Sequence, residues 1–102
     1  MEADKVLLSL VVPHNVEDAV TDLLLAHSDL VPGFTTTKGE GHGIGVELLD
    51  VGEQVRGSAR RVSVRIVCSR SEADQVLALI KQALPKANLF YWMVPVLASG
   101  RL

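Results

Sequence analysis

The chain has 102 residues, and 48% of them are hydrophobic, which suits one domain with a real core and is too apolar for a disordered chain. Its net charge of −2 gives no global attraction to nucleic acid or to an anionic membrane, and no apolar run approaches the roughly 20 residues that cross a bilayer. The single Cys68 cannot form an internal disulfide, and the acidic start MEADK lacks the positive charge of a signal peptide. We therefore expect a cytoplasmic protein that binds no nucleic acid and does not insert directly into a membrane.

The first third of the chain predicts a strand, a helix and a second strand. Lys5–Val12 is rich in aliphatic residues and ends at a proline, which is typical of a strand followed by a turn. Asn15 is the expected N-cap of a helix that ends before the stop signal at residues 30–33. The threonine-rich stretch Phe34–Lys38 is then expected to form the second strand.

The same order recurs after a glycine-rich segment. Residues 39–57 hold six of the eight glycines of the chain. Arg61–Cys68 alternates between apolar and polar side chains and predicts a strand. Ser71 is the expected N-cap of a second helix that ends at Pro85, and Leu89–Leu97 is the expected last strand.

This order predicts an α+β fold, namely a single ferredoxin-like βαββαβ domain over residues 1–102, with two helices on one face of a four-stranded antiparallel sheet. The second face is expected to be apolar, since Leu7 and Val11 alternate with the core residues of the first strand and the last strand is apolar on both sides. A large exposed apolar patch usually marks an interface, and another copy of the chain is the economical cover. The alternative is that the C-terminal residues fold back across the sheet.

A family resemblance adds a more specific expectation. The stretch Gly33-Phe34-Thr35-Thr36-Thr37 with the Gly-X-Gly-X-Gly run at 39–43 resembles the second strand and the start of the T-loop in the PII-like superfamily. This superfamily of trimeric ferredoxin-like proteins includes the nitrogen-regulatory PII proteins and CutA. The resemblance implies a homotrimer in which 39–57 is the T-loop.

A closer resemblance rests on Gly52-Glu53-Gln54-Val55-Arg56-Gly57, on Arg60-Arg61-Val62 and on the ending from Phe90 to Leu102. These segments resemble an uncharacterised PII-like subfamily associated with heavy-metal efflux systems of the resistance-nodulation-division type. The resemblance implies a signalling protein that modulates a membrane efflux transporter. The alternatives are a direct metal-binding buffer similar to CutA and an interaction module that needs no small ligand.

Three groups of residues are candidate contact sites in such an assembly. The T-loop-like segment is expected to bind the partner, or else to form a hairpin that packs on the adjacent subunit. Its candidate partner-binding residues are Ile44, Val46, Glu47, Leu48, Glu53 and Gln54. Candidate residues for an inter-subunit or anion contact are Arg56, Arg60, Arg61 and Arg101, and those for the trimer core are Tyr91, Trp92 and Met93.

A metal site and a nucleotide site are the remaining candidates. His42 with Glu40 offers imidazole and carboxylate ligands for a divalent transition metal, completed by three copies near a threefold axis; the alternative is a solvent-exposed loop histidine. Nitrogen-regulatory PII proteins bind ATP or ADP with a glycine- and lysine-rich loop before the last strand, whereas residues 84–89 contain no glycine. Standard adenine-nucleotide binding is therefore not expected. No catalytic motif is recognisable, so we do not expect an enzyme.

Overall fold

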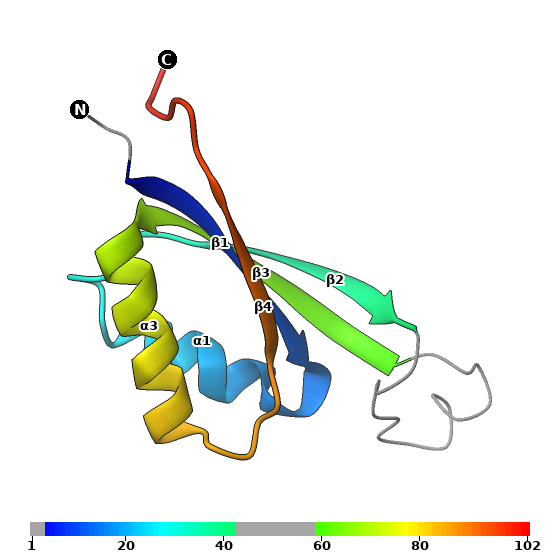
Figure 1. Cartoon of the computed structure of the whole chain (residues 1–102). Coiled ribbons are helices and arrows are strands. Elements are labelled where there is room, and N and C mark those ends of the chain that lie inside the picture. The colour runs from blue at the N-terminus through cyan, green and yellow to red at the C-terminus, as the bar shows by residue number, and fades with distance from the viewer. Residues whose placement is uncertain (1–3, 43–58) are drawn as a thin grey trace.

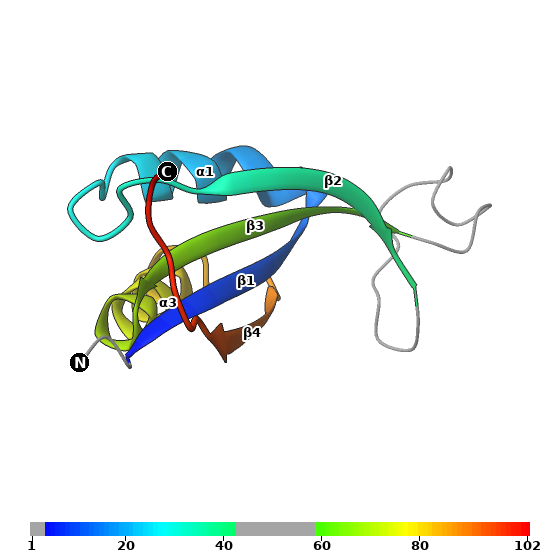
Figure 2. The same ribbon diagram turned by 90° about the horizontal axis from the view of Figure 1, so that it is seen from above.

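The computed structural model describes residues 4–42 and 59–102, which form a four-stranded antiparallel sheet with two helices on one of its faces (Figure 1). The elements along the chain are β1 (Lys5–Pro13), the 3-10 helix η1 (His14–Val16), α1 (Glu17–Leu25), β2 (Thr35–Gly41), β3 (Ala59–Ser69), α3 (Arg70–Ala83) and β4 (Phe90–Pro95). The strands lie in the order β2-β3-β1-β4, as Figure 2 shows from above. The predicted βαββαβ fold is therefore confirmed.

The core lies between the sheet and the two helices. Alternate side chains of β1 from Val6 to Val12 are buried there, and β3 pairs each of them with another buried side chain. The helices add Val20 and Leu24 from α1 and three residues from α3. The complete set of buried hydrophobic side chains in this cluster is Val6, Leu8, Leu10, Val12, Val20, Leu24, Val31, Val62, Val64, Ile66, Cys68, Ala73, Val76 and Ile80.

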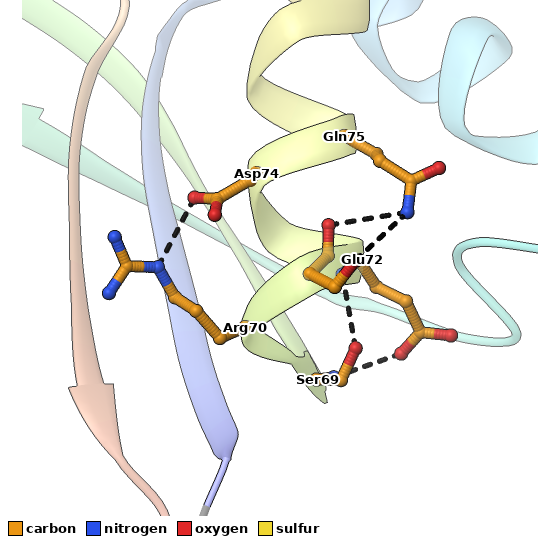
Figure 3. A network of polar contacts seen from close by, with 6 residues as sticks. Ser69, Arg70, Glu72, Asp74 and Gln75 are labelled. Carbon is orange, nitrogen blue, oxygen red and sulfur yellow. Dashed lines mark hydrogen bonds and ion pairs between the residues drawn. The ribbon is translucent and has the colours of Figure 1, made fainter.

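Helix α3 begins with a capping box that the sequence prediction placed two residues too late. The N-cap is Ser69, not Ser71: Ser69 Oγ accepts a hydrogen bond from the Glu72 backbone N–H at 3.0 Å, and Glu72 Oε1 accepts one from the Ser69 N–H at 2.9 Å (Figure 3). Strand β3 runs on to Ser69 because that residue still pairs with Lys5 of β1. The helix therefore starts directly where the sheet ends.

The predicted cap of α1 is also wrong. Asn15 lies inside η1, and the residue before α1 is Val16, whose side chain makes no capping bond. The 3-10 turn takes over part of this task, because the Glu17 backbone N–H donates to the His14 carbonyl. At the other end α1 stops at Leu25. In the part of the chain that the structure describes, no helix is long and apolar enough to cross a membrane.

Candidate functional site

The face of the sheet away from the helices, here called the open face, carries a contiguous apolar area. Its members are Leu7, Val11, Val67, Phe90, Trp92 and Val94. Pairing in the sheet places Leu7 between Val67 and Val94, and Val11 beside Phe90. The exposed fractions of Phe90, Trp92 and Val94 are 68%, 44% and 43%. The rings of Phe90 and Trp92 lie 6.0 Å apart between centroids, so the two aromatic side chains form one surface.

The C-terminal residues do not cover this area. The Val96 backbone N–H still donates to the Lys5 carbonyl at 3.0 Å, but the chain then leaves the sheet beyond the end of β4 (Figure 1). Leu97 and Leu102 are themselves fully exposed. The alternative in which the C-terminal segment folds back across the sheet is therefore not what the structure shows.

The other half of the open face is polar. In the sheet Ser9 lies between Trp92 of β4 and Arg65 of β3, and it is only 3% exposed. Arg65 Nη2 donates a hydrogen bond of 3.0 Å to Thr37 Oγ1 on β2. One face thus combines an aromatic and aliphatic area with an adjoining area of hydroxyl groups and a guanidinium, which is the usual anatomy of a protein interface.

The structure divides the three residues predicted for a trimer core between the two faces of the sheet. Trp92 lies on the open face, whereas Tyr91 pairs with Leu10 and Met93 pairs with Leu8, both of which face the helices. Met93 packs against the core of its own chain. The reason is the alternation of side chains along a strand, which sends neighbouring residues to opposite faces.

A polar cluster lies at the end of the sheet where β2 stops and β3 starts. It surrounds a cavity of about 270 Å3 lined by His14, Glu17, Lys38, Gly39, Arg60 and Arg61. Arg60 Nη2 lies 3.4 Å from His14 Nε2, which can only accept in this pair. The structure places His14 and Lys38 beside Arg60 and Arg61, although the sequence did not mark His14 or Lys38 as residues of this site. The inter-subunit or anion contact expected of the two arginines stays a prediction. Only the strand register, with Pro13 opposite Arg61, reveals this neighbourhood.

The remaining predicted residues are separate from this cluster or lie outside the described residues. Arg101 is in the exposed C-terminal segment. Arg56 and all six candidate partner-binding residues, Ile44, Val46, Glu47, Leu48, Glu53 and Gln54, fall outside the described residues.

The structure does not assemble a metal site around the predicted ligands. Glu40 lies near the end of β2, where it pairs with Arg60 in the sheet, and His42 follows the strand as an exposed residue. Among residues 4–42 and 59–102, no three histidine, cysteine or acidic side chains are grouped to hold a metal ion. Cys68 is buried in the core, and desolvation, with a smaller contribution from Glu72, raises the pKa of its thiol although Lys5 acts in the opposite direction. A metal site at His42 therefore stays a prediction.

Comparison with known proteins places the chain in a family. The family model described as "Protein of unknown function (DUF3240)" matches residues 2–102. The chain belongs to the DUF3240 family. A solved DUF3240 family protein from Shewanella baltica is similar over 98% of both chains, with 17% sequence identity and a TM-score of 0.79. No curated protein matches the chain.

Two further solved structures share the fold of this DUF3240 protein. CPII, a nitrogen regulatory PII-like protein from Thiomonas intermedia bound to ADP, AMP and bicarbonate, is 12% identical over 96% of both chains, with a TM-score of 0.69. CutA from Synechococcus elongatus, in complex with Bis-Tris, is 15% identical over 96% of this chain and 85% of CutA, with a TM-score of 0.74. The predicted PII-like fold is confirmed, and at these identities the likeness concerns the fold alone.

Proposed function

We propose that this protein is a PII-like regulator that assembles into a closed homotrimer through its open sheet faces and modulates a heavy-metal efflux transporter. The PII-like fold supports the regulatory class. The observation that carries the assembly is the exposed apolar area around Phe90, Trp92 and Val94, which none of the residues 4–42 and 59–102 shields.

The composition of the open face favours a second copy of the chain as its cover. Its centre is aromatic and aliphatic, and Arg65 with Thr37 supplies a polar border that is already hydrogen-bonded. Faces of this kind bury well against one another around a symmetry axis, because every copy then contributes the same aromatic centre. The number of three copies comes from the resemblance to the PII-like superfamily.

The regulatory partner comes from the same resemblance, whereas the signal is argued from the ligand chemistry of His42 and Glu40. By this resemblance the T-loop is the segment 39–57, of which residues 39–41 belong to β2 in the structure. The segments 52–57, 60–62 and 90–102 carry the likeness to the subfamily associated with heavy-metal efflux. A divalent transition metal bound through His42 is the proposed signal. An adenine nucleotide in the standard mode is disfavoured, because the loop between α3 and β4 contains Pro85, which has no N–H, and no glycine.

Two measurements test the proposal. Light scattering coupled to size exclusion at micromolar concentration should give three times the 11.0 kDa mass of the chain. Calorimetric titration with zinc, copper, cobalt and nickel should give heat that His42→Ala removes and that His27→Ala, its control, retains. His27 suits the control because its Nδ1 donates to the Leu23 carbonyl at 2.9 Å, far along the chain from the loop. Absence of heat with every metal, and with ATP and ADP, would refute the sensory role.

Partner binding needs a separate experiment. A tagged chain should recover a subunit of a heavy-metal efflux transporter from membranes solubilised in mild detergent. Deletion of residues 44–54 should abolish the recovery and leave the number of chains in the assembly unchanged. Recovery that persists after the deletion would exclude this segment as the contact.

A further inference from the structure

A groove lies on the helix-bearing side of the sheet, between the second half of α3, the loop that follows it and strand β4. Its volume is about 380 Å3, which is within the range of small-molecule pockets. Leu10 and Ile80 line it as buried residues of the core, and Leu77, Leu84 and Leu89 line it as half-buried residues. The groove is therefore an apolar depression with preformed walls.

The groove exists because the helix layer is narrower than the sheet. Helix α3 packs chiefly against β1 and β3, so the edge strand β4 is left without a helix above it. Tyr91 belongs to the helix-facing side of β4 and is nevertheless 49% exposed. The loop between α3 and β4 then closes one end of the space, with Asn88 in the left-handed region at a φ of 55°.

The polar groups of the groove define the charge of its ligand. Lys81, Asn88 and Tyr91 line it and supply an ammonium, an amide and a phenol, whereas none of the described residues that line it is an aspartate or a glutamate. Within the described part of the chain no ion pair engages Lys81. The chain as a whole has more acidic than basic residues, so a groove whose described lining holds one cation and no carboxylate differs from the average surface.

We propose that this groove binds a small amphiphilic carboxylate, with its aliphatic part against the leucine side chains and its carboxylate at the Lys81 ammonium. The hydroxyl of Tyr91 and the amide of Asn88 are the neutral donors of the same site. The site lies on the side of the sheet opposite to the open face and within one chain. It therefore rests neither on the proposed trimer nor on a metal at His42.

The experiment uses the full chain with decanoate and 1-decanol as paired probes of equal chain length. Titration calorimetry should show one decanoate bound per chain and weaker binding of decanol. Lys81→Met should weaken decanoate binding about five- to tenfold and leave decanol within about twofold, because only the charged head contacts the ammonium. Lys86→Met is the matched control, since Lys86 is an exposed lysine nearby that does not line the groove.

Two further variants separate the groove from other apolar surfaces. Leu77→Ser should weaken both probes, and Val94→Ser on the open face should weaken neither. Decanoate should shift the backbone amide resonances of Asn88 and Leu89. Equal binding of the two probes, unchanged binding in Lys81→Met, or loss of binding in Val94→Ser would each overturn the proposal. So would release of single chains by Leu77→Ser alone, because the groove would then hold a segment of another copy.

Discussion

Removal of one exposed aromatic side chain should weaken the assembly and leave each chain folded. Phe90 is 68% exposed on the open face, and Leu25 is 66% exposed at the end of α1, so the two residues form a matched pair. Both are replaced by serine. If copies of the chain cover the open face, Phe90→Ser weakens the assembly, whereas Leu25→Ser removes a similar exposed fraction from a surface outside the contact.

The expected loss of association free energy follows from the apolar area that Phe90 can still bury. A phenylalanine side chain that buries about 200 Å2 when fully covered has about 135 Å2 left to bury at 68% exposure. At about 25 cal/mol per Å2 this corresponds to about 3 kcal/mol for each contact. Since about 1.4 kcal/mol changes a dissociation constant tenfold, Phe90→Ser should raise it about a hundredfold. The tilted ring contact with Trp92 is also lost, but it lies within one chain and is therefore lost from the free chain and the assembly alike.

Sedimentation equilibrium over a concentration series measures both variants and the parent chain. The parent chain and Leu25→Ser should dissociate at the same concentration, and Phe90→Ser should dissociate at a concentration far higher. Far-ultraviolet circular dichroism checks that all three are folded. The reasoning is refuted if Phe90→Ser assembles like the parent chain, or if the parent chain is a stable 11.0 kDa particle at micromolar concentration.

Three smaller predictions concern the fold, each measured by urea unfolding at one protein concentration. Ser69→Ala should lower the free energy of unfolding by about 1 kcal/mol through loss of the capping box, whereas Ser71→Ala should change it little. Asn88→Ala should cost about 1 kcal/mol and Asn88→Gly should not, because the residue has a φ of 55°; equal effects would contradict this. Burial raises the pKa of the Cys68 thiol, so the folded chain keeps a proton that the unfolded chain loses. Stability should therefore fall as the pH rises above the ordinary thiol pKa of about 8.5, and Cys68→Ala should flatten that fall.

The strands were predictable because their signal is local. In Arg61–Cys68 apolar and polar side chains alternate, and the structure extends this strand by a few residues to Ala59–Ser69. The two-sided apolar pattern of the first and last strands likewise predicted an apolar second face, and the structure shows one around Phe90 and Trp92. Local alternation fixes both the strand and the face to which each side chain points.

The N-cap of α3 was not predictable in the same way, because two overlapping sequence patterns fit a capping box there. Ser69 is followed three residues later by Glu72, and Ser71 is followed three residues later by Asp74, so both match a capping box. The choice depends on where β3 ends, and that depends on its pairing with Lys5, far away in the sequence. In the structure Asp74 instead forms an exposed ion pair with Arg70 at 3.2 Å (Figure 3).

The polar cluster around His14 and Arg60 shows the same limit for a site. His14 and Arg60 are 46 positions apart, and neither carries a local signal that points to the other. The antiparallel register of β1 with β3 brings them within reach of each other, and the register of β2 with β3 adds Lys38. The sequence itself made Arg60 and Arg61 candidates, but only the pairing of strands far apart in the sequence reveals their neighbours.

Strand β4 shows why the proposed assembly and the proposed ligand site can be tested independently. Its odd and even residues face opposite sides, so Phe90 and Trp92 belong to the open face while Tyr91 lines the groove under α3. A substitution at either set leaves the other surface in place, provided that β4 keeps its pairing with β1. In the double variant, Phe90→Ser should weaken assembly and Lys81→Met should weaken decanoate binding by the same factors as in the single variants, since the two surfaces share no side chain. Non-additive effects would mean that β4 itself shifts when the groove is filled, which would make the edge strand the link between ligand and assembly.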